Sequence, residues 1–413
     1  MTFASKFPPA PLSAVAGFIN GDRSTNYPKG DDYVNEGVAF ISAADLVNGR
    51  VDYSRARQIS SAAYERLRSG KVQPRDILFC LRGSLGKMAY VQEQESSAIA
   101  SSLVIVRAKE SVDSRYLYYT LSSQDAQQVT GGLNNGAAQP NLSVAELQRV
   151  QIPLPMLTAQ RRIAGILAGY DELIENSLRR IKILEAMARD LYREWFVHFR
   201  FPGHENHPCV ASVLGEIPKG WEVVAFTELA DVLSGGTPKT DVPEYWNGDI
   251  PFFTPKDAPP CFYVEDAERH VTELGLSKCA SALYPADTVF ITARGTVGKV
   301  AMPSVPMAMS QSCYALRGKK GCTQHFLFLM TIQQVDYLKT NTGGATFDTI
   351  VVDTFRRMKV IKPPLNLLAS FSRKVEPLLK QVSLLQRQVS NLRRTRDLLL
   401  PRLLSGQIEV EAA

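Results

Sequence analysis

The chain contains two copies of one pattern, and this repeat constrains its fold more than any other feature. Residues 82–89, Arg-Gly-Ser-Leu-Gly-Lys-Met-Ala, return at 294–301 as Arg-Gly-Thr-Val-Gly-Lys-Val-Ala, an offset of 212 residues. Four further matches keep the same order along the chain: Phe40-Ile41-Ser42 with Asp45 and Phe252-Phe253-Thr254 with Asp257, Ser102–Arg107 and Ser312–Arg317, Tyr116–Tyr118 and Phe326–Phe328, and Gly131-Gly132 and Gly343-Gly344. Such an ordered set indicates a tandem duplication.

Each copy begins with a globular part that mixes helix and strand. Short apolar runs closed by glycine turns predict buried strands at 76–81 and 287–292, and further strands are expected at 102–106 and 312–316. Helical spacing predicts helices over 116–129 and 326–338, and the Gly-Gly pair after each is expected at the helix C-cap. The predicted fold class is therefore mixed α/β (α+β), with two globular domains in tandem.

Each copy ends with a long helix. Apolar or small residues recur at steps of three and four over about five heptads, which is typical of a coiled-coil seam. The first seam comprises Ile163, Ile166, Tyr170, Leu173, Ser177, Ile181, Leu184, Ala188, Leu191 and Trp195, and the second comprises Leu368, Phe371, Val375, Leu378, Val382, Leu385, Val389, Leu392, Arg396, Leu399 and Leu403. Pro377 and Pro401 are expected to kink or end the second helix. Because each helix has one stripe to bury, we expect an antiparallel pair with pseudo-twofold symmetry.

The order of these parts sets the expected domain boundaries. The chain divides into a first globule (1–155), a first spacer helix (156–199), a linker (200–220), a second globule (221–364), a second spacer helix (365–405) and a C-terminal tail (406–413).

Composition excludes several classes of protein. No stretch of 18 apolar residues occurs and the N-terminus has no apolar signal segment, so no membrane is expected. The six cysteines form no C-x-x-C pair, which argues against a zinc ribbon and favours a reducing, cytoplasmic location. The net charge of +6 lies within 365–405, where eight basic residues face two acidic ones. This surplus fits DNA, a protein partner or a solvated helix face.

The repeated R-G-[ST]-x-G-K turn is the first candidate binding site. Its residues are Arg82, Gly83, Ser84 and Lys87 in one copy, and Arg294, Gly295, Thr296 and Lys299 in the other. The glycine turn can present amides and two cations to a phosphate, and either arginine can reach a guanine edge. The spacing is not that of a Walker A loop. An exposed turn between strands explains the same residues.

Loops of small and polar residues are the second candidate. Asn and Gln pair with adenine, and Ser or Thr with a base or phosphate, although turn formation accounts for the same composition. The proposed DNA-contacting residues in these loops are Arg23, Ser24, Asn134, Gln139, Asn141, Thr237, Lys239 and Thr346, and Lys256 is proposed in addition. Four possible metal ligands, His198, His204, His207 and Cys209, match no zinc pattern, and a polar linker is the expected role of that segment.

No catalytic motif was found. The chain lacks a P-loop, a G-x-S-x-G elbow, an N-P-P-[FY] or D-P-P-Y methyltransferase motif and a nuclease-like set of acids with lysine. Asp76 and Asp287 lie near strand starts, but no E-x-K follows at a suitable distance. The chain is therefore expected to recognise a partner and not to act as an enzyme.

Further motifs resemble the specificity subunit (HsdS) of type I restriction–modification systems. These are the G-x-I-P-x-G-W run at 215–221, the Ser-Gly-Gly-Thr-Pro run at 234–238, the repeated turns, and the Leu-Pro-Met and Pro-Pro-Leu entries to the helices at 154–156 and 363–365. The resemblance covers nearly the whole chain. It departs at the first globule, which lacks the G-x-I-P-x-G-W opening and starts at Phe7-Pro8-Pro9.

The resemblance implies two target recognition domains that each read half of a bipartite site in double-stranded DNA. It also implies two methyltransferase subunits (HsdM) and the restriction and motor subunits (HsdR) as partners. S-adenosylmethionine, ATP and magnesium would be held by those partners, with no cofactor or metal in this chain. Two alternatives stay open: a DNA endonuclease with a dispersed acidic metal site, and a coiled-coil assembly protein that binds no nucleic acid.

Overall fold

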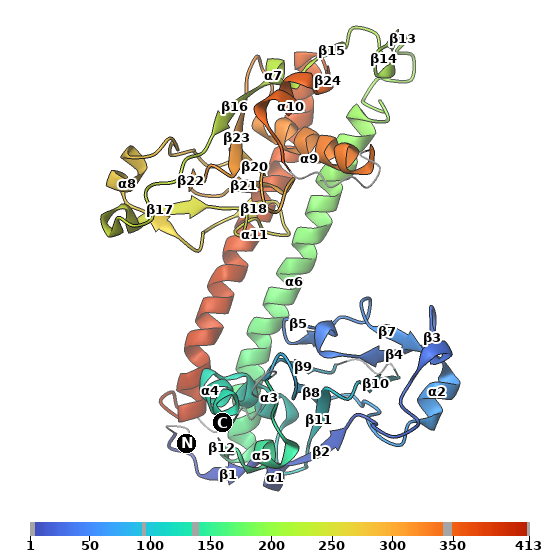
Figure 1. Ribbon diagram of the computed structural model, residues 1–413, viewed down its shortest axis with the longest axis vertical. Coiled ribbons are helices and arrows are strands. Elements are labelled where there is room, and N and C mark those ends of the chain that lie inside the picture. Colours follow the sequence, from blue (N-terminus) through green and yellow to red (C-terminus); the bar gives the residue numbers. More distant parts are fainter. Residues whose placement is uncertain (1–4, 93–95, 134–139, 342–348, 411–413) are drawn as a thin grey trace. The chain divides into compact units, whose positions relative to one another are not determined.

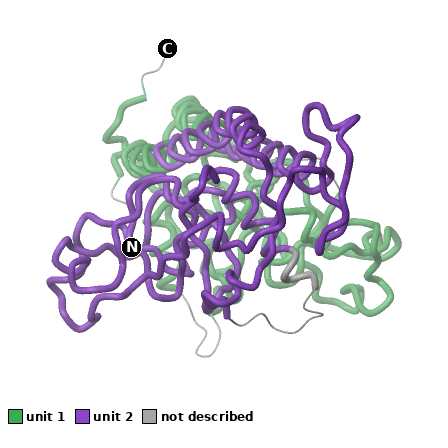
Figure 2. The backbone as a smooth tube through the Cα atoms, turned by 90° about the horizontal axis from the view of Figure 1, so that it is seen from above, with its two compact units in different colours: residues 1–173, 392–413 green, residues 174–391 purple. Residues whose placement is uncertain are grey.

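The computed structural model describes residues 5–92, 96–133, 140–341 and 349–410. The chain forms two compact units, one from residues 1–173 with 392–413 and the other from residues 174–391 (Figure 2). Two long helices, α6 (Leu157–Phe196) and α11 (Leu365–Ser405), each contribute residues to both units (Figure 1).

The globule of the first unit contains two four-stranded sheets. The first has the antiparallel order β2 (Ala16–Asn20), β11 (Leu103–Ala108), β8 (Ile77–Cys80) and β9 (Met88–Tyr90), and the second has the order β10 (Ser97–Ile99), β4 (Val38–Ile41), β7 (Arg57–Ile59) and β3 (Tyr33–Val34). Two small pairs are β1 (Pro9–Pro11) with β12 (Gln151–Pro153), and β5 (Leu46–Val47) with β6 (Arg50–Val51). The helices are α1 (Leu12–Val15), α2 (Ser61–Arg66), α3 (Ser114–Ser122), α4 (Gln124–Gly132) and α5 (Val144–Arg149), with 3₁₀ turns η1 (Gly30–Asp32) and η2 (Ala43–Asp45).

The globule of the second unit repeats this plan. Its main sheet has the order β16 (Ala230–Ser234), β23 (Cys313–Gly318), β20 (Val289–Thr292), β21 (Val300–Pro303) and β18 (Tyr263–Val264). A second sheet has the order β19 (His270–Val271), β17 (Trp246–Phe253) and β22 (Ala308–Met309), and two pairs are β15 (Glu222–Ala225) with β24 (Lys359–Lys362), and β13 (Cys209–Ser212) with β14 (Gly215–Pro218). The helices are α7 (Phe226–Leu229), α8 (Glu273–Ser277), α9 (Gln324–Asn341) and α10 (Val352–Arg357), with the 3₁₀ turn η3 (Pro243–Tyr245).

The strand pairings confirm the tandem repeat and the mixed α/β fold. The order β2-β11-β8-β9 recurs as β16-β23-β20-β21, and the parallel pair β4–β10 recurs as β17–β22. The predicted strands at 76–81 and 287–292 contain β8 and β20, whose residues are all buried because both faces of each sheet are covered. The first copy also has a counterpart of the strand that follows the G-x-I-P-x-G-W run, since β1 pairs with β12 as β15 pairs with β24.

The predicted helices of the globules need two corrections. The helix expected over 116–129 is divided into α3 and α4 at Ser123, whose hydroxyl donates to the Thr120 carbonyl (2.7 Å) and accepts from the Ala126 amide (3.3 Å). Gly131 and Gly132 lie inside α4, so their prediction as a C-cap is wrong. The other pair, Gly343 and Gly344, lies outside the described residues.

Of the two effects expected at Pro377 and Pro401, a kink or a helix end, the helix end is contradicted. Helix α11 is continuous across both prolines. Both side chains are exposed, so the helix carbonyls that lose their amide partner at these positions can face water.

The seam predicted for α11 is confirmed, since each of its residues is buried or half-buried. The seam predicted for α6 is wrong at two places, because Ile166 and Leu173 are 40% and 51% exposed while their neighbours Leu167 and Ile174 are buried. A 3.6-residue helix drifts from a strict 3.5-residue repeat, and in the first unit Leu167 faces the core of the globule.

The contacts within each unit make the two helices antiparallel, as predicted. In the second unit Phe371, near the start of α11, packs against Trp195 and Phe196 at the end of α6, with ring centroids 5.8 and 4.9 Å apart. In the first unit Arg396, near the end of α11, binds Asp171 in the first half of α6. None of the helices among the described residues is long and apolar enough to cross a membrane.

Candidate nucleic-acid interface

Strand register gathers the predicted DNA-contacting loops at one end of each main sheet. In the first unit the last residues of β2 and β8, Asn20 and Cys80, lie opposite Val104 and Leu103 at the start of β11. We call the adjoining residues 21–26, 81–87, 100–102 and 140–142 the first loop cluster. The second loop cluster, residues 235–240, 293–299, 310–312 and 349–351, arises in the same way, because β16 and β20 end opposite the start of β23.

Backbone hydrogen bonds hold the first loop cluster together. The Leu81 amide donates to the Ser102 carbonyl (2.9 Å), the Leu142 amide to the Leu81 carbonyl (2.9 Å) and the Gly83 amide to the Pro140 carbonyl (3.0 Å). Three loops that are far apart in sequence are therefore joined by their main chains.

The second cluster has matching bonds. The Ala293 amide donates to the Ser312 carbonyl (2.8 Å), and the Ile350 amide donates to the Ala293 carbonyl (3.0 Å). The Gly236 amide adds a bond to the Met309 carbonyl (3.1 Å). Both clusters are thus built by the same main-chain connections.

The glycines of the repeated turn have a conformational role. Gly83, Gly86, Gly295 and Gly298 have φ values of +80°, +74°, +78° and +76°, in the left-handed region that favours glycine. In the first copy the amides of Gly83, Leu85, Gly86 and Lys87 all donate to protein carbonyls. The turn of the first copy therefore offers side chains, and not a cradle of free amides, to a phosphate.

The basic side chains of the first cluster are already engaged. Arg82 donates from Nε to Asn141 Oδ1 (3.2 Å), and Arg23 donates from Nη2 to the Ser101 carbonyl (3.0 Å). Lys87 donates from Nζ to the Ala43 carbonyl (2.6 Å) and is half-buried. Ser24 and Ser84 are exposed. Lys87 thus anchors η2 to the turn, which is a structural role.

The basic side chains of the second cluster, unlike those of the first, are not engaged by other described residues. Arg294, Gly295, Thr296 and Lys299 are all exposed. Lys239, in the same cluster, and Lys256, after β17, are exposed too. Within the described residues, the side-chain nitrogens of these four cations have no hydrogen-bond or ion-pair partner. Thr237 donates to Gln311 Oε1.

Three of the predicted contact residues, Asn134, Gln139 and Thr346, lie outside the described residues. Conversely, Gln311 and Asp22, which contribute to these loops, were not among the residues predicted from the sequence. The buried carboxylate of Asp22 accepts from the amides of Ser24 (2.8 Å) and Arg68 (2.9 Å) and so shapes the loop after β2. Hydrogen bonding, first from Ser24, lowers the pKa of Asp22. Its position in an Asn-Gly-Asp run was the available signal.

Asp76 and Asp287, the two acids near strand starts, are engaged with protein partners. The described residues contain no group of three His, Cys, Asp or Glu side chains placed to hold a metal ion. Asp76 is buried and bound through both oxygens by Arg107 (2.7 and 2.8 Å), at the end of β8 away from the loop cluster. Asp287 accepts from the Tyr263 hydroxyl (3.0 Å).

The segment with three histidines and Cys209 is folded. His204 Nδ1 lies 2.8 Å from the Phe201 carbonyl oxygen and His207 Nε2 lies 2.7 Å from the Lys219 carbonyl oxygen. Phe201 packs against Trp221, with ring centroids 5.3 Å apart. The segment predicted as a linker therefore includes an aromatic cluster and the β13–β14 hairpin.

A duplicated α/β globule, with a loop cluster in each copy and a long helix after each, defines a protein with two recognition domains. Residues 16–186 and 218–383 match the family described as type I restriction modification DNA specificity domain, and the chain belongs to that family. Its role is accordingly that of a specificity subunit, which is not itself an enzyme.

Relatives and solved structures agree with this assignment. The chain is 27% identical to the type I restriction enzyme MjaIX specificity subunit of Methanocaldococcus jannaschii, over 94% of this chain and 90% of that protein. It is 22% identical to the HindI specificity subunit of Haemophilus influenzae, over 94% and 98%. The fold matches the crystal structure of the S subunit of a type I restriction–modification system from M. genitalium with a TM-score of 0.62 and 16% identity, covering 98% and 99% of the two chains.

Proposed function

We propose that this chain reads a bipartite site in double-stranded DNA, with one loop cluster on each half-site. The observation that carries the proposal is the repetition of the loop cluster at the same end of the same sheet in both units. A duplicated reading surface with different side chains suits a target made of two different half-sites.

The side chains in the clusters suit base and phosphate contacts. Arg82 and Asn141 are hydrogen-bonded to each other, and arginine and asparagine are the residues that pair bidentately with guanine and adenine. The exposed cations of the second cluster, including Arg294 and Lys299, suit phosphate oxygens. Loops held by main-chain bonds present these groups without a large ordering cost.

We further propose that the long helices bind two methyltransferase subunits and, through them, the restriction and motor subunits. Arg373, Lys380 and Arg387 recur every seven residues on α11 and are exposed. Leu384, which is 51% exposed, lies among them. A face that is both basic and apolar suits an acidic protein surface better than DNA, because leucine offers nothing to a phosphate. S-adenosylmethionine, ATP and magnesium then belong to those partner subunits, and a cytoplasmic location remains a prediction.

Methylation mapping tests this proposal. The chain is produced with its methyltransferase subunits in a host that lacks other methylation, and the modified positions are sequenced. We expect one bipartite motif with a fixed gap, and exchange of the second globule should change only one half-site. A contiguous motif, or methylation without this chain, would contradict the proposal.

The two alternatives have separate outcomes. Cleavage of a plasmid by the purified chain with magnesium alone would favour an endonuclease. Failure of the assembled complex to bind any duplex DNA would favour an assembly protein without a nucleic-acid ligand.

A further inference from the structure

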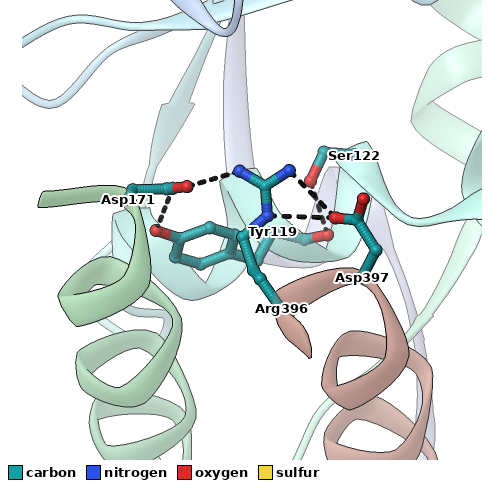
Figure 3. Close-up of polar contacts among 5 residues, drawn as sticks. All are labelled: Tyr119, Ser122, Asp171, Arg396 and Asp397. Atoms are coloured by element: carbon teal, nitrogen blue, oxygen red, sulfur yellow. Dashed lines mark hydrogen bonds and ion pairs between the residues drawn. The ribbon is translucent and has the colours of Figure 1, made fainter. Parts of the chain in front are cut away.

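In the first unit, a polar cluster lies where α3, α6 and α11 meet (Figure 3). Asp171, on α6, is bound through both of its oxygens. Arg396, on α11, contacts Oδ1 from Nη1 at 2.5 Å, and Tyr119, on α3, donates its hydroxyl to Oδ2 at 2.6 Å. One carboxylate therefore joins the first globule to both long helices.

Arg396 is unusual for its position in the helix. It stands between Leu392 and Leu399 in the predicted seam of α11 and is the one charged residue of that seam. Its guanidinium is also bound by Asp397, from Nη2 at 2.9 Å and from Nε at 3.0 Å to Oδ1. The side chains of Arg396 and Asp171 are only 29% and 22% exposed.

The surroundings keep the Arg396 guanidinium charged and the Tyr119 phenol protonated, because the pKa of each is raised. Burial acts to lower the pKa of Arg396, but the carboxylates of Asp171 and Asp397 more than offset it, so this pKa is raised. Burial, followed by the bond to Asp171, raises the pKa of Tyr119, so the phenol keeps its proton and donates.

We propose that Asp171, Arg396 and Tyr119 are positioning residues that hold the first globule and both helices in one alignment, and thereby help to fix the gap between the DNA half-sites. The proposal rests on the proposed function. Aliphatic seam residues tolerate neighbouring alignments, because one leucine or valine can take the place of another. A shifted alignment would leave the Asp171 carboxylate against an aliphatic side chain without its cation, which is strongly unfavourable.

A merely stabilising role makes a different prediction. Replacing a half-buried ion pair by apolar residues is often neutral for stability, whereas loss of an alignment device broadens the set of accepted geometries. The decisive readout is therefore the accepted gap length, and not the melting temperature.

The experiment uses the chain assembled with its methyltransferase subunits and a DNA library. The library carries the mapped half-sites with gaps from three base pairs shorter to three longer than the natural one. The variants are Arg396→Met, Asp171→Asn and Tyr119→Phe, and the control is Arg393→Met, which removes an exposed arginine from the same turn of α11.

We expect the wild type and Arg393→Met to methylate one gap length. Arg396→Met should raise methylation at gaps one base pair longer or shorter, relative to the natural gap, by at least about tenfold, and Tyr119→Phe by about threefold. Wild-type gap preference in a folded Arg396→Met complex would overturn the proposal. If that variant fails to fold, Tyr119→Phe decides by the same criterion.

The two proposals fail in different ways. If the wild-type complex methylates no bipartite site, the proposed function is wrong. If the wild type requires one gap and all three variants require it equally, only the positioning role is wrong.

Discussion

The two loop clusters should contribute unequally to the salt dependence of DNA binding. Two matched double substitutions test this: Arg294→Ala with Lys299→Ala, and Arg82→Ala with Lys87→Ala. The first pair removes exposed cations without protein partners among the described residues. The second removes an arginine bound to Asn141 and a lysine bound to the Ala43 carbonyl.

The expected magnitude follows from counterion release. Each phosphate contact adds about 0.9 to the slope of log affinity against log salt concentration. If Arg294 and Lys299 each contact one phosphate, their loss lowers the slope by about 1.8. Between 50 and 200 mM salt, the variant then loses about 12-fold less affinity than the wild type does.

The pair in the first copy should behave differently. Because the Lys87 ammonium already donates to the Ala43 carbonyl, only the loss of Arg82 should affect phosphate contacts, and the slope should fall by about 0.9 at most. The lost bond to the Ala43 carbonyl should lower the free energy of unfolding by roughly 1.5–3 kcal/mol. Fluorescence anisotropy with the cognate duplex, using the assembled complex, measures the slopes, and urea unfolding of the chain measures the stability.

Equal slopes for the two double variants would refute the reasoning that protein contacts withdraw Lys87 from DNA. An unaltered slope in the Arg294 and Lys299 variant would place that turn away from the DNA.

Three further changes have defined outcomes. Burial raises the pKa of Glu185, so the folded state disfavours its charge; Glu185→Gln should therefore increase the free energy of unfolding at pH 7, and the gain should vanish once the pH falls below the ordinary glutamate value of 4.5. If the variant and the wild type differed in free energy of unfolding by the same amount at pH 7 and at pH 4, this would be contradicted. Phe371→Ala empties a fully buried site between the helices and should cost about 3–5 kcal/mol in urea unfolding; a loss below about 1 kcal/mol would exclude the aromatic cluster as a major stabiliser. Removing one heptad from both α6 and α11 should shorten the methylated gap by about three base pairs, because seven residues span about 10 Å; an unchanged gap would show that the helices do not set it.

Much of the architecture could be predicted from the sequence, because it depends on local patterns. Buried strands such as β8 and β20 are short apolar runs, and the long helices carry a heptad repeat. The glycines of the repeated turn are needed for left-handed backbone in both copies. These features follow from steric and burial preferences within a few residues, so a single sequence is enough to find them.

The roles of individual residues needed the tertiary structure. Lys87 and Lys299 occupy the same place in the repeat, yet Lys87 is half-buried on the Ala43 carbonyl and Lys299 is exposed. Likewise, the spacing predicted Ile166 and Leu173 in the α6 seam, but in the folded protein Leu167 and Ile174 are buried there. Long-range partners decide such cases, and residue spacing carries no information about them.

The sequence by itself therefore determined that the protein is a duplicated recognition chain with a long helix after each globule. Only the tertiary structure decided which cations stay free for a ligand, and that Arg396 in an apolar seam is matched by Asp171, a residue 225 positions away. A charge in such a seam is stable only when other side chains supply its partners, and the fold brings one of them, Asp171, from a distant part of the chain.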